Sequence, residues 1–200
     1  MKYRLPMVLL VVLVLLFAFS SIASARANST SNEDLLRNKK IVERYFFEVV
    51  DRLGVGDSPS EQWKVQADDV ENVLDELFTD KAIQHFPGAP MSAPKELLVH
   101  IRNGSTKSMK TTIHHLMAES NLVSAHISHD LIPKRGEMMS RPRIGCQVQF
   151  SGDTIHWDAM AFFRMENGKI AEEWISRDDL GMLLQLGKIA FEPCAPMAKK

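Results

Sequence analysis

The sequence is poor in cysteine and carries no surplus of positive charge. Only Cys146 and Cys194 occur in 200 residues, and neither belongs to a C-x-x-C pair. This spacing argues against a zinc ribbon or a dithiol redox centre. The two thiols could be joined in a disulfide or both be free and buried, and the sequence leaves this open. With 24 Lys and Arg against 25 Asp and Glu, the chain lacks the charge for nucleic-acid binding, and no such partner is expected.

The apolar run at the start of the sequence is short for a membrane span. The apolar run over 7–19 is shorter than the roughly 20 residues that a spanning helix needs, which disfavours the alternative of an uncleaved anchor. Two basic residues precede this run and an A-x-A site ending at Ala25 follows it, the order typical of a secretory signal peptide. Residues 1–25 are therefore predicted to be removed, and 26–32 to form a polar linker. The product is expected to be secreted or periplasmic, without membrane contact.

Helical periodicity dominates the first half of the remaining chain. Ser31 followed three residues later by Asp34 resembles a capping box, and apolar residues recur behind it at helical spacing. Pro94 is typical of a helix start. The predicted elements are helices over 33–53, 61–79 and 94–103, with a short strand over 81–86 between the last two.

From residue 109 onward the apolar residues alternate with polar ones, which is the period of a strand. Asn167-Gly168 is the strongest turn signal in the chain. Helices first and strands afterwards predict an α+β fold: three N-terminal helices packed on a curved antiparallel sheet, then a short C-terminal helix. Such a sheet is expected to leave a pocket. The predicted elements are a hairpin of 111–118 with 122–132, a loop over 133–143, a second hairpin of 144–150 with 154–165, a strand over 169–176 and a helix over 179–186.

Several segments resemble the SnoaL-like polyketide cyclases. The stretch GKIAEEW, followed by Asp178, Leu180-Gly181 and Gln185-Leu186-Gly187, is similar to the closing motif of that family. ENGKI, AIQHFPG and MAESNLVSAH resemble further family segments. The likeness places a SnoaL-like domain over 33–187, followed by a tail over 188–200. It implies the cone-shaped fold shared with nuclear transport factor two and ketosteroid isomerase, and an aldol ring closure without metal or cofactor.

The resemblance implies a general acid and base at Asp178, which occupies the position of the family's catalytic aspartate. Such a base needs a dry pocket that raises its pKa toward the working pH. The structural alternative is a helix N-cap, for which Asp is among the preferred residues. Strand parity places Asp178 on the same face as Ile170 and Trp174, which would direct it toward the pocket.

The histidines are sorted by strand parity. His126 and His129 are three residues apart, and His114 and His115 are adjacent, so the members of each pair are expected on opposite faces. No metal site is therefore predicted. His129 falls in the inward set, and His85 matches the family's pocket-side histidine. Both are predicted to be catalytic hydrogen-bonding residues that hold an oxyanion or hydroxyl, with satisfied core histidines as the alternative.

Four side chains are predicted to bind the substrate. The strand over 154–165 places alternate residues inward, and its small alanines between bulky neighbours would leave room for a ligand. Ala161 departs from the family, in which this position often holds an aspartate. The predicted substrate-binding residues are Trp157, Ala159, Phe163 and Trp174.

Two functions stay open. The first is a cofactor-free enzyme acting on a small hydrophobic molecule, either an aldol-type cyclase or isomerase that uses Asp178, or a hydrolase as in relatives of limonene epoxide hydrolase. The second is a non-catalytic ligand-binding or interaction module, with the sheet face bearing His126 and His156 as a homodimer interface. Ala161 favours binding, because it removes a polar partner for the base, whereas the density of histidines favours chemistry.

Overall fold

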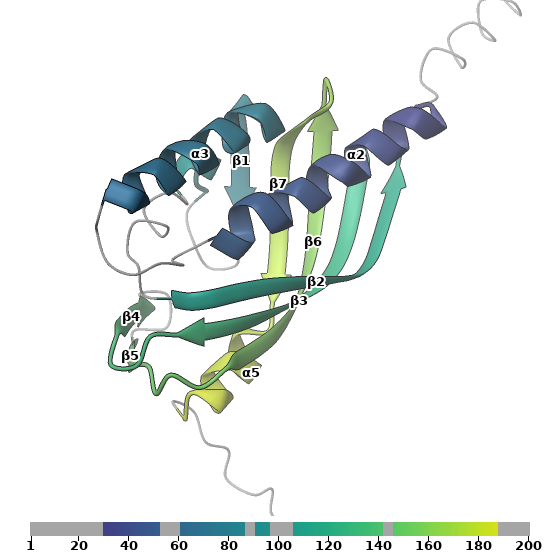
Figure 1. Ribbon diagram of the computed structural model, residues 1–200. Coiled ribbons are helices and arrows are strands. Elements are labelled where there is room, and N and C mark those ends of the chain that lie inside the picture. The colour runs from purple at the N-terminus through teal and green to yellow at the C-terminus, as the bar shows by residue number, and fades with distance from the viewer. Residues whose placement is uncertain (1–29, 53–60, 87–90, 97–105, 142–145, 188–200) are drawn as a thin grey trace, which may run out of the picture.

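The structure is a computed structural model, and it describes most of the predicted domain (Figure 1). The predicted signal peptide, the tail and Cys194 lie outside the described residues. In the described part of the chain, no helix is both long and apolar enough to cross a membrane. The described ranges are 30–52, 61–86, 91–96, 106–141 and 146–187.

The first predicted helix is confirmed, but it changes its winding on the way. Helix α2 (Asn32–Arg44) continues into a π-helical turn, η1 (Tyr45–Val49), and a 3₁₀ turn, η2 (Val50–Arg52). The predicted capping box is present, because the Ser31 hydroxyl accepts a hydrogen bond from the Asp34 N–H at 3.1 Å. The helix thus begins at the predicted cap.

The next elements differ from the prediction at their ends. Helix α3 (Glu61–Leu77) stops two residues early, because strand β1 (Phe78–His85) begins at Phe78 and is longer than expected. Phe78 is buried in the core from the first position of the strand. The third predicted helix begins as a 3₁₀ turn, η3 (Pro94–Glu96), and the rest of it lies outside the described residues.

Five strands form the main sheet in the order β1-β7-β6-β3-β2. The first predicted hairpin is confirmed as β2 with β3, and the turn at Asn167-Gly168 joins β6 to β7 with positive φ at both residues. Strand β1 runs parallel to β7, and the other neighbours are antiparallel. The further strands are β2 (Thr106–Glu119), β3 (Leu122–Pro133), β6 (Ile155–Glu166) and β7 (Lys169–Arg177).

The second predicted hairpin is wrong. Strand β5 (Cys146–Gln149) pairs with β4 (Met138–Arg141) in a separate two-stranded sheet, whereas β6 pairs with β3 and β7. The sequence predicts a loop over 133–143, but β4 forms there and pairs with β5 in place of β6. Gly136, with φ near +83°, donates its N–H to Phe150 O at 2.9 Å beside the β4–β5 pair.

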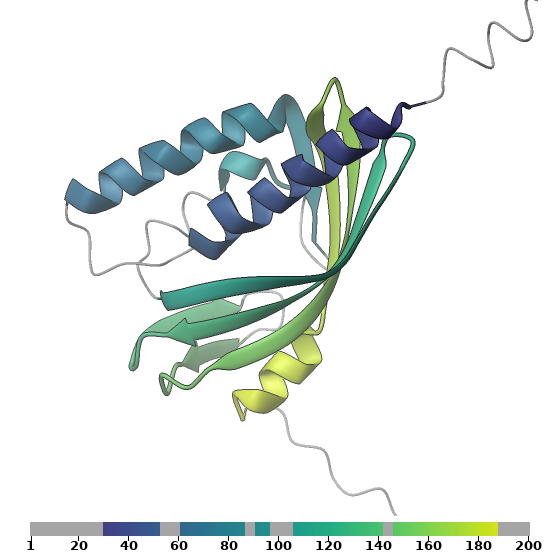
Figure 2. The same cartoon turned by 45° about the vertical axis from the view of Figure 1, so that its right-hand side comes forward.

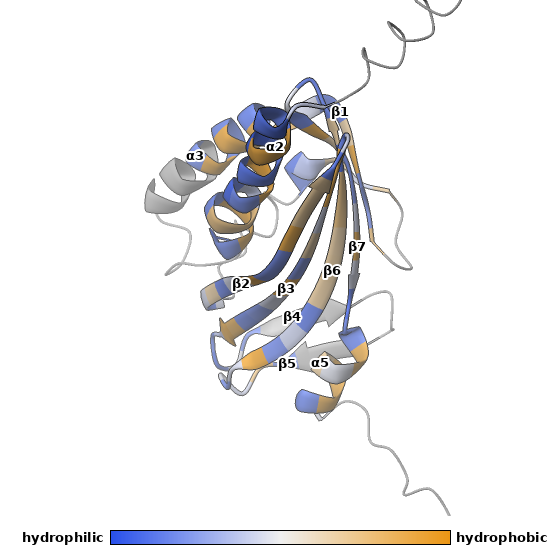
Figure 3. Ribbon diagram, turned by 90° about the vertical axis from the view of Figure 1, so that its right-hand side faces the viewer, coloured by the Kyte–Doolittle hydropathy of each residue, from blue (hydrophilic) through white to orange (hydrophobic). Residues whose placement is uncertain are grey.

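The sheet is strongly bent into an upper and a lower half, and helices α2 and α3 cover only the upper half (Figure 2). Helices α2 and α3 lie across one face of the upper half, while the lower parts of β2, β3 and β6 turn away from them. Hydrophilic and hydrophobic residues alternate along these strands (Figure 3). We call the face toward α2 and α3 the inner face and the opposite one the outer face. The α+β class with a curved antiparallel sheet is confirmed.

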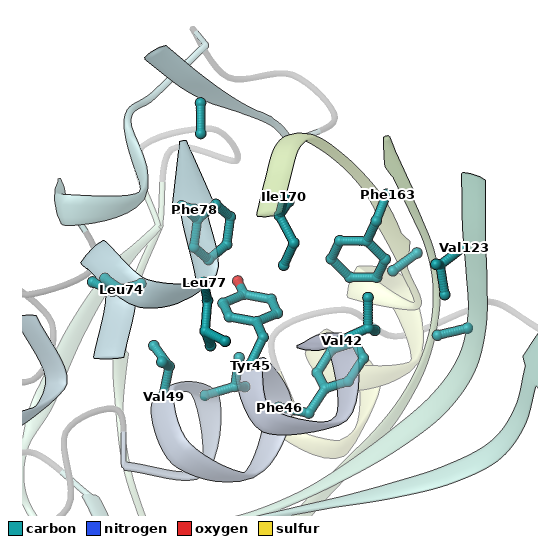
Figure 4. Close-up of a cluster of buried hydrophobic side chains, with 14 of the residues drawn as sticks. Val42, Tyr45, Phe46, Val49, Leu74, Leu77, Phe78, Val123, Phe163 and Ile170 are labelled. Atoms are coloured by element: carbon teal, nitrogen blue, oxygen red, sulfur yellow. The ribbon is translucent and has the colours of Figure 1, made fainter. Parts of the chain in front are cut away.

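A solid core fills the space between the helices and the inner face (Figure 4). The Phe163 ring meets those of Tyr45 and Phe46 edge to face, with centroids 5.9 and 5.8 Å apart. Ala159 and Ala161 are only 3% and 0% exposed in this core, so neighbouring side chains occupy the room predicted beside them. The labelled core residues are Val42, Tyr45, Phe46, Val49, Leu74, Leu77, Phe78, Val123, Phe163 and Ile170.

The C-terminal helix α5 (Asp179–Gln185) matches its prediction and covers a strand edge. Strand β7 ends at Arg177, opposite Ala159, so the first residues of β6 have no partner from β7. The Gln185 side chain replaces that partner: its Nε2 donates to His156 O at 2.5 Å, and its Oε1 accepts from His156 N at 2.9 Å. One carboxamide thus makes the pair of bonds that another strand would have made.

Candidate functional site

The structure divides the predicted site residues between the two faces of the sheet. His129, Trp157, Ala159 and Phe163 point to the inner face and are buried there. His85 and Trp174 lie on the outer face, and Asp178 precedes α5. The three predicted catalytic residues are therefore not brought together.

A bulge explains why strand parity failed for Trp174. Glu172 pairs with Arg164 and Ile170 pairs with Met165, so Ala171 is an extra residue in β7. Ile170 is fully buried in the core, while Trp174 is 38% exposed on the other face. The expectation that these two residues share a face is wrong, because one inserted residue reverses the alternation.

Asp178 makes the contact of a helix N-cap. Its Oδ1 accepts a hydrogen bond from the Gly181 N–H at 2.8 Å, and its side chain is exposed. A Cβ at position 181 would run into this carboxylate, so the glycine makes room for the cap. The structural alternative weighed for Asp178 is thus present, and its catalytic role stays a prediction.

A chain of hydrogen bonds links His129 to a carboxylate on the inner face. Thr111 on β2 lies directly opposite His129 on β3, and Oγ1 of Thr111 is 3.0 Å from Nδ1 of His129. The same Oγ1 is 2.5 Å from Oδ1 of Asp51 in η2. His129 and Thr111 are buried and Asp51 is half-buried. Among the described residues, Nε2 of His129 has no hydrogen-bond partner.

Burial favours the neutral forms of both ends of this chain. Desolvation, and secondly the positive charge of Arg177, lower the pKa of His129 to about 4. Desolvation raises the pKa of Asp51 above its usual value, and hydrogen bonds from Thr111 oppose this only in part. His129 is therefore an uncharged imidazole at neutral pH.

The single hydroxyl proton of Thr111 gives the chain two arrangements. When Asp51 is ionised, Thr111 donates to the carboxylate and accepts from Nδ1–H of His129, so Nε2 is free to accept a proton. When Asp51 is protonated, it donates to Thr111, Thr111 donates to Nδ1, and Nε2 carries the hydrogen. The protonation of Asp51 thus decides whether Nε2 of His129 accepts or donates.

A buried aromatic side chain contacts the His129 end of the hydrogen-bonded chain. The Trp157 ring lies 5.1 Å from that of His129 at an angle of 40°, and it belongs to a lower apolar cluster. Burial of the imidazole strengthens electrostatic interactions at Nε2. The other buried members of the lower cluster are Leu131, Phe150, Ile155 and Met182.

Two residues of the hydrogen-bonded chain were not predicted from the sequence. Thr111 could have been found only with knowledge of the bulge at His114, because the pairing continued from the turn without that shift would place Thr112 opposite His129. Asp51 could not, because its contact with Thr111 joins residues 60 positions apart and the sequence gives no signal of that pairing. Asp51 was predicted only to lie in the helix over 33–53, without a functional role.

A second polar cluster lies deeper in the core. Glu173 accepts a hydrogen bond from the Tyr45 hydroxyl at 3.1 Å, and its Oε2 also contacts the side-chain amide of Gln84. Desolvation raises the pKa of Glu173 to about 7. All three side chains are buried.

The outer face carries a shallow cavity of about 290 Å³. The rings of His85 and Trp174 are stacked there, with centroids 5.2 Å apart. Nε2 of His85 lies 2.8 Å from Oε1 of Glu172, and this contact, followed by one from Arg164, lowers the pKa of Glu172. One ring nitrogen of His85 is thus already occupied. The lining residues are His85, Phe86, Met160, Phe162, Trp174, Ile175 and Ser176.

Comparisons with known proteins agree with the fold. Residues 64–173 match the SnoaL-like domain. No curated protein matches the sequence. Similar solved structures include one assigned as a SnoaL-like polyketide cyclase from Jannaschia sp. CCS1, 14% identical with a TM-score of 0.57, covering 81% of this chain and 99% of that one.

Two further structures have the same architecture. TsrD from Streptomyces laurentii is 16% identical with a TM-score of 0.54, covering 80% of this chain and 100% of that one. An LEH-like epoxide hydrolase from M. tuberculosis is 13% identical with a TM-score of 0.50, covering 77% of this chain and 92% of that one. Identities this low establish a common fold and not a common activity.

Proposed function

The chain belongs to the SnoaL-like domain family, and we propose that it is a cofactor-free enzyme that transfers a proton on a small hydrophobic carbonyl compound. The reaction class is an aldol-type cyclisation or an isomerisation. The observation that carries the proposal is the hydrogen-bonded chain from Asp51 through Thr111 to His129. Pairs of titratable groups with shifted pKa values in an apolar setting are typical of acid–base sites.

The proton moves in three linked transfers. Nε2 of His129 takes a proton from the carbon next to the substrate carbonyl. Nδ1 passes its own proton to Oγ1 of Thr111, and the hydroxyl proton of Thr111 goes to Asp51. The substrate becomes an enolate, His129 ends as the other neutral tautomer, and Asp51 ends as a carboxylic acid. Charge and protons balance, and no imidazolium forms.

The pKa shifts support this route over proton storage on His129. A pKa of about 4 disfavours the imidazolium by roughly 3 kcal/mol relative to an exposed histidine. Asp51, by contrast, has a raised pKa, so burial helps it to hold the proton. Asp51 is the net base, although His129 is the group that would touch the substrate.

Arg177 supplies the electrostatic part of the proposal. Its charge acts on the imidazole of His129, where it disfavours a second positive charge. The same charge would stabilise a negative enolate oxygen held beside Nε2. The cation is fixed by a 2.8 Å bond from its Nε to Asp179, so it is oriented before substrate binds.

Hydrogen–deuterium exchange tests the proposal without knowledge of the natural substrate. A panel of small hydrophobic ketones and β-diketones is incubated with the protein in D₂O, and exchange next to the carbonyl is followed by NMR. Thr111→Val should abolish exchange above the buffer rate, whereas Thr111→Ser, which keeps the hydroxyl, should retain it. Equal rates in Thr111→Val and the wild type would rule the relay out.

The second candidate function is a non-catalytic module that pairs with a second copy through the outer face. Of the eleven large hydrophobic side chains exposed among the described residues, six lie on this face. Soluble monomers seldom leave so many apolar side chains together. The six are Ile83, Met117, Leu122, Met160, Phe162 and Trp174.

Sedimentation velocity separates this candidate from the first. The wild type should sediment as a dimer at micromolar concentration, and Phe162→Ser combined with Met160→Ser should sediment as a monomer. Leu36→Ser, which removes an apolar side chain that is 64% exposed on α2, is the matched control and should stay dimeric. A monomeric wild type would remove the homodimer proposal and leave the enzyme proposal untouched.

Export is proposed on the sequence pattern of 1–25 alone. Mass spectrometry of the product released from cells that express the full chain should give an N-terminus at Arg26. An intact chain beginning at Met1 in the membrane fraction would contradict both cleavage and release.

A further inference from the structure

Three histidine rings gather on the outer face, although two of them are adjacent in sequence. The His126 ring on β3 lies 4.9 Å from the ring of His114 and 5.5 Å from that of His115, both on β2. Adjacent residues on a regular strand point to opposite faces, so His114 and His115 were expected to be separated. That expectation is wrong.

A bulge brings the adjacent histidines to one face. The pairing of β2 with β3 shifts between Ile113, opposite Ile127, and His115, opposite His126. His114 is therefore the extra residue, and β-bulges commonly redirect a side chain in this way. The bulge turns His115 to the same side as His126, directly across the strand pair.

His115 and His126 meet edge to edge. Their Nδ1 atoms are 3.2 Å apart and the ring planes differ by only 7°, with the nitrogens lying between the ring centroids. One Nδ1 must carry a hydrogen and the other must be bare for this contact to be a hydrogen bond. The two Nδ1 atoms thus point at each other and share a single proton.

We propose that His115 and His126 form a two-imidazole site for a divalent transition-metal ion of the class that prefers imidazole, such as Zn²⁺ or Cu²⁺. Two Zn–N bonds of about 2.0–2.1 Å in tetrahedral geometry place the nitrogens roughly 3.3 Å apart. The observed 3.2 Å already matches this separation. The metal ion replaces the shared proton, which is released to solvent.

Only the ring orientations have to change. The two Nδ1 atoms now point at one another, so each ring must turn about its terminal torsion until both nitrogens point at one metal ion. That torsion is broad for histidine, and neither ring is buried. Ser124 and Ser128 flank His126 on the same face, so no bulky neighbour on its own strand blocks the turn.

Water completes the coordination. His114 has its Nε2 bonded to Ser128 at 2.8 Å, and within the described residues no group of three or more His, Cys, Asp or Glu is arranged to hold a metal ion. The proposed site is therefore open, with two protein ligands. His156, on the same face, is paired with Asp130 at 2.8 Å and lies outside the site.

A Zn²⁺ titration of the tag-free full chain, followed through the imidazole ¹⁵N signals, tests the proposal. One equivalent should move the signals of His115 and His126 and leave that of His156 in place. Loss of an outer-shell partner alone costs about 10–100-fold in metal affinity, so His115→Asn and His126→Asn should each weaken binding by at least about tenfold. His156→Asn is the matched control and should bind as the wild type does.

Two results would overturn the proposal. One is an absence of any shift at His115 and His126 when Zn²⁺ is in excess. The other is equal Zn²⁺ affinity in the wild type and in both variants, which would place the ion elsewhere, for example at the cysteine thiols. Both rings lie at the surface, so circular dichroism should report an unchanged fold in each variant.

Discussion

The Tyr45 hydroxyl lies 3.1 Å from Oε2 of Glu173, and this bond joins the first helical segment to the last strand across 128 positions of sequence. Both side chains are almost completely buried. Glu173 has a pKa of about 7, above its ordinary value of 4.5, because burial disfavours its charge. The core therefore holds a carboxylic acid that ionises close to neutral pH.

Replacement of Glu173 by Gln should remove a pH-dependent contribution to stability. A carboxyl whose pKa is raised on folding contributes stability that is fully present below its unfolded pKa, near 4.5, and is lost as pH rises through about 7. The contribution lost is on the order of 3 kcal/mol. Urea unfolding should thus show Glu173→Gln gaining stability relative to the wild type between pH 4.5 and pH 8. Glu166→Gln, an exposed control, should not gain, and a pH-independent difference for Glu173→Gln would contradict the assignment.

Replacement of Asp51 by Asn should lower the exchange activity without lowering the stability. The proposed reaction needs ionised Asp51, so exchange activity should rise as pH increases through its raised pKa. Loss of a positioned base costs about 10²–10⁴-fold in rate, and Asp51→Asn should lose that much. The variant should be at least as stable as the wild type at neutral pH, because burial penalises the charge that it removes. A rate profile that falls with pH would be incompatible with Asp51 as the base.

Gly181→Ala and Asp178→Ala should destabilise the protein through the same lost contact. Each removes the cap bond from the Gly181 N–H to Asp178, the first because its Cβ collides with the carboxylate. Loss of an N-cap costs about 1 kcal/mol. The double variant should therefore cost less than the sum of the two in thermal unfolding. Full additivity would mean that the two residues act independently.

Asp178→Asn tests the catalytic role that the family resemblance implies. Asn is as good a cap as Asp, so the stability should stay within a few tenths of a kcal/mol of the wild type. If exchange activity also stays unchanged, Asp178 is a structural cap. A large loss of activity at unchanged stability would instead support a catalytic carboxylate at this position.

Gln185→Ala should loosen α5 from the sheet. The substitution leaves the N–H and C=O of His156 without their partners, at a cost of about 1–3 kcal/mol for each unsatisfied group that stays buried. Amide hydrogen exchange at His156 should accelerate. Gln149→Ala, which removes only a 3.5 Å exposed contact, is the control and should leave that exchange unchanged.

Local signals in the sequence predicted the elements well. The capping box at Ser31, the turn at Asn167-Gly168 and the alternation along β6 are each encoded within a few residues. They fix where elements begin and which side chains face inward. The inward set that includes His129 and Trp157 was identified for this reason.

The errors arose where one extra residue interrupts a strand. Ala171 and His114 each reverse the alternation in their strands, which misplaced Trp174 and His115. A bulge has no firm sequence signal, because it depends on the register of the neighbouring strand. The contact of Asp51 with Thr111 is equally invisible, since it depends on how η2 meets β2 in three dimensions.

The π-helical turn at 45–49 makes the proposed active site depend on the number of residues in this segment as well as on the identity of the relay residues. A π turn contains one residue more than an α-helical turn, and such insertions rotate everything that follows by about 100°. Asp51 follows this turn by two residues. Deleting one residue of the turn would leave every side chain of the relay in the sequence, yet direct the Asp51 carboxylate about a quarter of a turn away from Thr111. Homologues of different length here would then have to find another base, even with His129 and Thr111 in place.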